Sequence, residues 1–290
     1  MIPAAFEYEV ATDLQHAIKL LKSAGGEGKF LAGGQSLIPL MKFRLAQPKL
    51  LVDLNRIANL SYIKENGELR IGALTRESAL ELSPVVRERY PILTDTAGVI
   101  ADPLVRNLAT IGGNLAHADP ANDHPATMLA LRASVVVVGP KGERVIPIDK
   151  LFIDTFTTSL AEDEILTEIR IPKPVARSGG AYVKLERKVG DFAIAGAAAY
   201  VTLDAGGKVL TAGIALTNVG PTAIRAKDAE ALLIGNAPEA KAIAAAAAAA
   251  AKGCQPVSDL RGPVEYKRDV VRVLTDRAIH IAIARARGGK

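Results

Sequence analysis

The chain has 290 residues, of which 49% are hydrophobic and 23% are charged. This length favours two domains, and this balance is typical of a globular protein rather than a disordered one. Residues 261–290 hold eight basic and three acidic residues, so this segment alone accounts for the net charge of +5. Tryptophan is absent and aromatics make up only 4%, which disfavours a nucleic-acid binder, because such proteins interleave basic stripes with aromatics. We interpret the basic C-terminus as a solvated helix rather than a docking or membrane-surface patch.

Cys254 is the only cysteine. A single cysteine excludes an internal disulfide. It also excludes a conventional iron–sulfur cluster held by this chain alone, because such a cluster needs about four thiolates. The first seven residues contain neither a basic segment nor an apolar core, so no signal peptide is expected. No uncharged apolar run of about 18 residues occurs, so no membrane span is expected either. We expect a cytoplasmic protein and leave open an association with the inner face of the membrane.

The N-terminal stretch has the pattern of a small α/β unit. Thr12 or Asp13 can cap a helix that ends at Gly25-Gly26. The expected elements, in chain order, are a helix to about Ala24, a strand over 29–32, a helix over 37–45 and a strand over 50–53.

The middle of the chain alternates strand and helix signals. Val135–Val138 is an unbroken β-branched run, typical of a buried strand, and Pro125 suits the first turn of a helix. The expected elements are a strand over 69–73, helices over 76–82 and 91–100, a long loop over 110–123, a helix over 125–132, and strands over 135–138 and 164–171.

Residues 172–180 contain two prolines and two glycines and are predicted to be a linker. After it, the pattern predicts an antiparallel meander backed by helices, with a hairpin turn at Asp204–Gly207. The expected elements are strands over 181–187, 193–203 and 209–216, and helices over 226–233, 239–251 and 266–286.

Two glycine pairs are the strongest chemical signals. The segment Ala32–Ser36, with sequence Ala-Gly-Gly-Gln-Ser, joins a strand to a helix, and Thr110–Asn114, with sequence Thr-Ile-Gly-Gly-Asn, lies among small and polar residues. Phosphate binding needs converging backbone N–H groups without an obstructing Cβ, and a helix N-terminus adds a favourable dipole. Either pair alone is more often a simple turn. Together they suggest a pyrophosphate held from two sides.

Other catalytic patterns are missing or weak. The chain contains no G-x-G-x-x-G, no P-loop, no G-x-S-x-G and no H-E-x-x-H motif. His117 and His124 are seven residues apart on an expected loop, a poor spacing for metal ligands, so no metal site is predicted. Asp119 and Asp123 could form a carboxylate pair with Asn122 beside them, but such residues in loops mostly make local turn hydrogen bonds.

Taken together, these segments resemble one family. Besides the two glycine motifs, the resemblance rests on Met1–Pro3, Ile100–Pro103 and Leu216–Val219. The chain is similar from residue 1 to about 287 to the medium, flavin-binding subunit of carbon monoxide dehydrogenase-type molybdenum hydroxylases, relatives of the flavin part of xanthine dehydrogenase.

The resemblance implies an α+β fold in two domains. Residues 1–176 would form a two-lobed FAD-binding domain of the vanillyl-alcohol-oxidase (PCMH) type, and residues 177–290 a C-terminal domain with a three-stranded antiparallel sheet and helices. It implies that both glycine motifs hold the FAD pyrophosphate and that Phe192 lies beside the isoalloxazine. Asp123, Leu166 and Lys184 match further flavin contacts. The implied contacts are Ala32, Gly33, Gly34, Gln35, Ser36, Thr110, Ile111, Gly112, Gly113, Asn114, Asp123, Leu166, Lys184 and Phe192.

Relatives differ at two of these positions. Many have Tyr where this chain has Phe192, and some have His where it has Gln35, so the ring is kept without its hydroxyl and the role of the Gln35 side chain stays open.

The resemblance also implies a function. FAD would take electrons from [2Fe–2S] clusters of an iron–sulfur small subunit, while a molybdopterin large subunit oxidises the substrate, in a dimer of heterotrimers with an external electron acceptor. Carbon monoxide, an aldehyde, a purine or an N-heterocycle would each be oxidised on another chain. The alternatives are a free-standing FAD-dependent dehydrogenase or reductase with its own substrate, and a non-catalytic nucleotide-binding or assembly protein.

Overall fold

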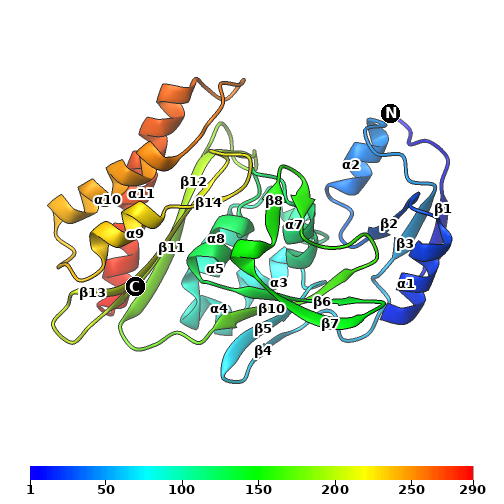
Figure 1. The fold of residues 1–290 in the computed structure, drawn as a ribbon, viewed down its shortest axis with the longest axis horizontal. Coiled ribbons are helices and arrows are strands. Elements are labelled where there is room, and N and C mark those ends of the chain that lie inside the picture. The colour runs from blue at the N-terminus through cyan, green and yellow to red at the C-terminus, as the bar shows by residue number, and fades with distance from the viewer. Residues whose placement is uncertain (290) are drawn as a thin grey trace.

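The computed structural model describes residues 1–289 and has three parts, each with its own hydrophobic core. Figure 1 shows them in a row, from a small N-terminal lobe through a central lobe to a C-terminal sheet covered by helices. No helix of the described residues is both long and apolar enough to cross a membrane.

The N-terminal lobe is a three-stranded parallel sheet in the order β1-β3-β2, flanked by two helices. Asp13 caps the first helix by accepting a hydrogen bond from His16 N at 2.8 Å. Ala17 and Ile18 of that helix pack against Val52 in the core. The elements are β1 (Glu7–Val10), α1 (Leu14–Ser23), β2 (Gly28–Leu31), α2 (Leu37–Lys42) and β3 (Leu50–Asp53).

The central lobe is a five-stranded antiparallel sheet in the order β4-β5-β10-β6-β7. Strand β10 lies in the middle, far in sequence from both of its neighbours. The sheet elements are β4 (Ile63–Glu65), β5 (Glu68–Gly72), β6 (Ser134–Gly139), β7 (Gly142–Pro147) and β10 (Ile165–Pro172). The other elements are α3 (Glu77–Leu82), α4 (Pro84–Arg89), α5 (Pro91–Gly98), α6 (Pro103–Arg106), α7 (Ile111–His117), α8 (His124–Ala130), η1 (Ile148–Lys150), β8 (Phe152–Asp154) and β9 (Thr157–Thr158).

The C-terminal part is an antiparallel sheet in the order β11-β12-β13-β14, buried on both faces. Its central strand is rich in alanine: Ala197 and Ala199 belong to the core under the C-terminal helices, while Ala198 belongs to the core of the central lobe. Small side chains let helices approach from both sides. The elements are β11 (Ser178–Glu186), β12 (Ala193–Leu203), β13 (Val209–Thr217), β14 (Ile224–Arg225), α9 (Lys227–Leu233), α10 (Ala240–Gly253) and α11 (Val264–Ala286).

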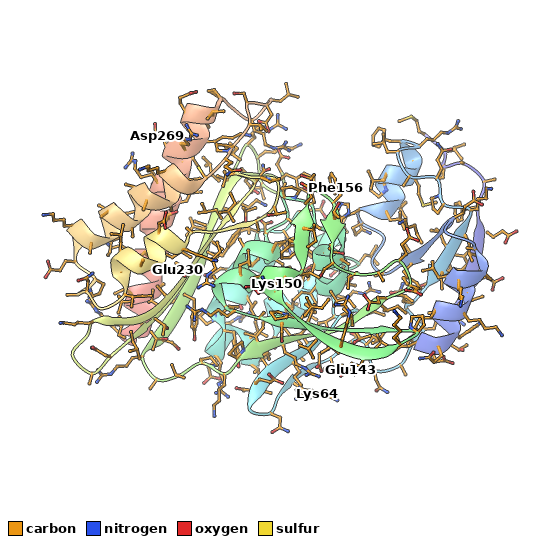
Figure 2. All side chains as sticks on the ribbon, in the orientation of Figure 1. Lys64, Glu143, Lys150, Phe156, Glu230 and Asp269 are labelled. Atoms are coloured by element: carbon orange, nitrogen blue, oxygen red, sulfur yellow. The ribbon has the colours of Figure 1, made fainter. Side chains whose placement is uncertain are left out.

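Polar contacts tie this sheet to its neighbours. Glu230 of α9, labelled in Figure 2, is buried and accepts hydrogen bonds from Arg225 and from Ile214 N. Arg285 of α11 forms an ion pair with Asp95 of α5, with atoms 2.6 Å apart. The second contact links the last helix to the central lobe across strand β11.

Four expectations from the sequence need correction. The expected loop over 110–123 contains helix α7, and the expected linker over 172–180 shrinks to 173–177 because β11 begins at Ser178. The C-terminal sheet gains a fourth, two-residue strand, β14. The basic C-terminal helix is solvated on one side only, because α11 buries residues such as Leu274 and Ile279 against the sheet.

Candidate functional site

The first glycine motif forms the turn between β2 and α2. Gly34 has φ of +73°, a conformation that glycine adopts without steric cost. The backbone amides of Gly33, Gly34, Gln35 and Ser36 donate to no group within residues 1–289. Ser36 precedes α2 without making a side-chain capping bond. Four successive amides and one hydroxyl therefore remain available to a ligand at the start of this helix.

The second glycine motif is the first turn of α7, and four of its five amides are occupied. Thr110 caps the helix by accepting a hydrogen bond from Gly113 N at 3.2 Å. Ile111 N donates to Thr75 O, and Gly112 N donates to Ala73 O. A Cβ on Gly112 would lie 2.5 Å from the Cβ of Ala73. Only the Thr110 amide has no partner within residues 1–289, so this motif supplies a close-packed wall rather than a row of free amides, which differs from a clamp with several N–H donors on both sides.

The structure brings the two motifs together. A Cβ on Gly33 would lie 2.2 Å from Leu108 O, so only glycine permits this approach of the two loops. On the other motif, a Cβ on Gly113 would lie 3.7 Å from the Cβ of Ala32. The free amides of the first loop thus lie beside the small residues of the second, although 76 positions separate Ala109 from Gly33 in sequence.

This arrangement fits a diphosphate. Free N–H groups in a turn at a helix N-terminus form an anion-binding concavity, and the helix dipole favours negative charge there. Small residues on the facing loop leave the ligand room. Gln35 turns its amide nitrogen back to Gly33 O at 3.2 Å, so its side chain shapes the loop.

Asp123 and Lys184, which the resemblance singled out, form a buried ion pair at the junction of the central lobe and the C-terminal sheet. Their side chains are 6% and 3% exposed, and Lys184 Nζ lies 3.1 Å from Asp123 Oδ2. Burial raises the pKa of the Asp123 carboxyl, while the Lys184 ammonium and the Tyr182 hydroxyl oppose that shift.

Tyr182 completes the Asp123 site, and the sequence did not indicate it. Its hydroxyl donates to Asp123 Oδ1 at 2.6 Å and lies 3.0 Å from Thr217 Oγ1. Burial raises the pKa of this phenol well above its usual value. A Cβ on Gly196 would lie 2.3 Å from the Tyr182 oxygen, so the glycine of β12 makes room for it. The alternation of β11 places Tyr182 and Lys184 on one face, the only sequence signal that could have paired them.

The Asp119 side chain makes a local turn contact, as predicted, whereas the Asn122 side chain bonds to a residue eight positions earlier. Asp119 Oδ1 accepts a hydrogen bond from Ala121 N at 2.9 Å. Asn122 donates to Asn114 O at 2.8 Å and so fixes the end of the second motif. They do not form a catalytic carboxylate pair with Asp123, whose oxygens face Tyr182 and Lys184.

The two histidines lie in different surroundings. His124 Nε2 is 2.7 Å from Glu77 Oε2, and both side chains are fully buried. His117 lies at the end of α7, with its ring 5.1 Å from that of Phe156, which Figure 2 shows on the β8–β9 hairpin. Burial lowers the pKa of His117.

The remaining two candidates differ in exposure. Leu166 is 7% exposed and belongs to the central core, where β10 pairs it with Val137. Phe192 is 49% exposed, and the Arg261 guanidinium carbon lies 5.9 Å from its ring centre. Asp191 Oδ1 accepts hydrogen bonds from Phe192 N at 2.8 Å and from Arg261 at 3.0 Å, which joins the loop before β12 to the loop before α11.

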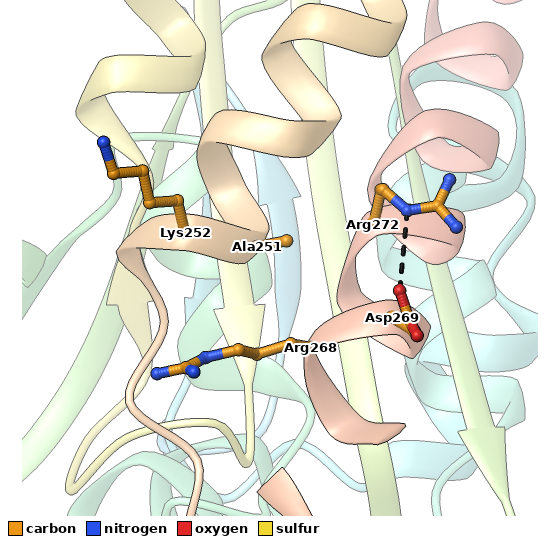
Figure 3. Close-up of a pocket in the computed structure, with 5 residues that line it drawn as sticks. All are labelled: Ala251, Lys252, Arg268, Asp269 and Arg272. Atoms are coloured by element: carbon orange, nitrogen blue, oxygen red, sulfur yellow. Dashed lines mark ion pairs between the residues drawn. The ribbon is translucent and has the colours of Figure 1, made fainter. Parts of the chain in front are cut away.

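A separate surface cavity of about 400 Å³ lies between α10 and α11, lined by Ala251, Lys252, Arg268, Asp269 and Arg272. Figure 3 shows that Arg268 and Arg272 point in opposite directions, and Arg272 is paired with Asp269. Figure 1 places these helices at the opposite end of the molecule from α2. The cavity therefore lacks converging donors and is not part of the glycine-loop site.

Two family models cover most of the chain. The model for the FAD binding domain in molybdopterin dehydrogenase matches residues 4–174. The model for the CO dehydrogenase flavoprotein C-terminal domain matches residues 180–282.

Whole-chain relatives and solved structures agree with the family models. The chain is 46% identical to the carbon monoxide dehydrogenase medium chain of Hydrogenophaga pseudoflava, covering 98% of this chain and 99% of the relative. It is 42% identical to the 6-hydroxypseudooxynicotine dehydrogenase complex subunit alpha of Paenarthrobacter nicotinovorans, over 100% of this chain and 98% of that relative. Among solved structures, carbon monoxide dehydrogenase from Hydrogenophaga pseudoflava superimposes with a TM-score of 0.95 at 48% identity, covering 98% and 99%. Quinoline 2-oxidoreductase from Pseudomonas putida 86 superimposes with a TM-score of 0.92 at 32% identity, and the match covers 99% of each chain.

Proposed function

Since the chain belongs to the FAD-binding flavoprotein subunits of the molybdenum hydroxylase family, we propose that it carries electrons from a partner iron–sulfur subunit to an external acceptor. The partners would be a small subunit with [2Fe–2S] clusters and a molybdopterin large subunit, in a dimer of heterotrimers. The observation that carries the proposal is the row of four free amides at Gly33–Ser36, facing the close-packed Thr110–Asn114 segment.

In this proposal the first motif binds the FAD pyrophosphate through its amides and the Ser36 hydroxyl. The second motif forms the opposite wall, and the exposed Phe192 ring packs beside the isoalloxazine. Asp191 and Arg261 fix the backbone and one face of that ring. Asp123 and Lys184 at the junction with the C-terminal sheet, and Leu166 of the central lobe, are proposed as further flavin contacts.

FAD, when bound, supplies an acceptor and donor that works with one or two electrons, which the side chains of this protein cannot do. The protein's part is to bind the cofactor, orient it and exclude water from it. With one cysteine, the chain alone lacks the roughly four thiolates that a conventional iron–sulfur cluster needs, so in this proposal the clusters belong to a partner.

The substrate is proposed to bind on another subunit. Relatives with 46% and 42% identity are named for complexes that act on different molecules, carbon monoxide and 6-hydroxypseudooxynicotine. Complexes that oxidise different substrates are expected to share the same flavin subunit fold if that subunit handles only electrons.

The same proposal assigns residues 1–176 to the FAD-binding domain and residues 177–290 to the C-terminal domain. It also assigns the protein to the cytoplasm, with the inner membrane face as a place of association, because a single cysteine suits a reducing compartment.

The test compares the purified chain with the reconstituted complex. Dithionite should bleach the flavin absorbance of the FAD-loaded chain, while carbon monoxide or an aldehyde should leave it yellow. Adding both partner subunits should make bleaching depend on the substrate of the complex. Steady turnover of a small organic substrate by this chain alone would overturn the proposal in favour of a free-standing dehydrogenase.

A further inference from the structure

The two glycine loops belong to different lobes. The core of the N-terminal lobe packs against Leu74 and Ile165 of the central lobe, but it contains no residue of 108–114, so the spacing of the two loops needs its own support. Apolar packing within each lobe does not by itself fix the spacing between Ala32 and Leu108. The polar contacts around Arg76, a residue outside both motifs, supply that support.

Arg76 contacts both sides of the site. It stands immediately before α3, where its backbone forms an isolated β-bridge with Thr110. Its Nη1 donates to Leu108 O, the carbonyl that lies against Gly33. Its Nη2 donates to Asn55 Oδ1 at 2.7 Å. The planar guanidinium can hold two acceptors at once in a fixed geometry.

Asn55 extends the link to the first motif. Its Nδ2 donates to Ala32 O at 2.9 Å and to Asp53 Oδ1 at 2.6 Å. Asp53 is in turn held by the Tyr8 hydroxyl and by Asn55 N. A continuous chain of hydrogen bonds therefore runs from Ala32 O through Asn55 and Arg76 to Leu108 O.

We propose that Arg76 and Asn55 are positioning residues that lock the two glycine loops together and so preform the FAD pyrophosphate cradle. The inference rests on the proposed role of Gly33–Ser36 in binding that group. A cradle held in its bound form does not lose loop entropy when the ligand arrives, so binding is tighter. Arg76 also places a positive charge next to the loop that receives two phosphates, and half-burial reduces its screening by solvent.

The test measures FAD affinity of the flavin-free full-length chain by quenching of flavin fluorescence. Arg76→Ala should weaken FAD binding at least tenfold, and Asn55→Ala should weaken it about threefold. Arg56→Ala is the matched control, because Arg56 is exposed and makes no side-chain hydrogen bond within the described residues. It removes the same charge one position from Asn55 and should leave affinity within twofold.

Chemical rescue separates positioning from general stability. Guanidinium at about 20 mM should recover several-fold affinity in Arg76→Ala, whereas sodium chloride at the same ionic strength should not. Arg76→Lys keeps the charge but cannot bridge two acceptors, so it should recover only part of the loss. The apo melting temperature of Arg76→Ala should stay close to that of Arg56→Ala.

The outcomes distinguish the inference from the function on which it rests. If Gly33→Val abolishes FAD binding while Arg76→Ala equals the Arg56→Ala control, the positioning role is wrong and the cradle stands. If neither Gly33→Val nor Arg76→Ala changes affinity, the pyrophosphate lies elsewhere and both are wrong. A fall in apo melting temperature of Arg76→Ala, with no rescue by guanidinium, would reduce Arg76 to a structural residue and overturn the inference.

Discussion

Replacing Lys184 by methionine should destabilise the protein strongly, because the change leaves a buried carboxylate without its cation. The Lys184 ammonium contacts Val99 O at 2.9 Å, Asp123 Oδ2 at 3.1 Å and Glu186 Oε2 at 3.2 Å, and its side chain is 3% exposed. Methionine fills a similar volume but offers these oxygens no proton. Breaking one partner of a buried pair costs about 3–5 kcal/mol. At roughly 2–4 °C per kcal/mol, the melting temperature should fall by about 6–20 °C.

The loss should depend on pH with a definite sign. Burial already raises the pKa of the Asp123 carboxyl, and removing Lys184 removes one of the groups that oppose this shift. In the variant, the folded state therefore holds a proton at pH values where the unfolded state has lost it. Stability then falls as pH rises from the unfolded pKa to the folded one, and levels off above it. The melting temperature deficit of Lys184→Met should be smaller at pH 5 than at pH 8.

Thermal melting followed by circular dichroism between pH 5 and pH 8 measures both effects. Lys188→Met is the matched control, since Lys188 is exposed near the end of the same segment. The double variant Asp123→Asn with Lys184→Met should regain part of the lost stability, because it removes the Asp123 charge, the more deeply buried of the two carboxylates that Lys184 contacts. A deficit below about 3 °C, or an equal deficit at pH 5 and pH 8, would refute the reasoning.

Three further predictions concern the flavin site. Gly33→Val should yield protein without flavin absorbance, because its Cβ would lie 2.2 Å from Leu108 O; a fully yellow variant would contradict this role. Phe192→Ala should alter the flavin fluorescence. It should shift the melting temperature by less than about 2 °C, since the Phe192 side chain is 49% exposed. An unchanged fluorescence spectrum would place the ring away from the flavin. Hydrogen bonds from Arg187 and Arg261 lower the pKa of Asp191 to about 2, so the Asp191 loop should gain stability above the unfolded pKa of this carboxyl and lose it as pH falls through about 2. Limited proteolysis should therefore cut this loop faster in Asp191→Asn than in wild type at pH 7. Equal cleavage rates would argue against the link between this loop and the loop before α11.

Local signals in the sequence predicted many elements well. The capping role of Asp13, the Gly25-Gly26 stop of α1, the buried strand around Val135 and the proline at the start of α8 are properties of a few neighbouring residues. Each depends on contacts between positions no more than about four apart, or on a short apolar run. The FAD-binding family was likewise indicated by short motifs, and the comparisons confirm it.

Other features were decided by tertiary structure. Helix α7 contains Gly112 and Gly113, poor helix formers, and it exists because Thr110 caps it and Ala73 O receives Gly112 N. One expected free amide of this motif, Gly112 N, is therefore occupied by a neighbour 39 residues away in sequence. No local pattern contains that partner.

The sequence by itself determined the cofactor class, the two glycine motifs and most helices and capped turns of this protein. Only the tertiary structure decided which amides stay free, that Tyr182 and Lys184 close on Asp123, and that Arg76 meets Asn55 between the lobes. The physical reason is range: capping and periodicity act within one or two turns of chain, whereas burial and hydrogen-bond partners are set by which strands and helices pack side by side.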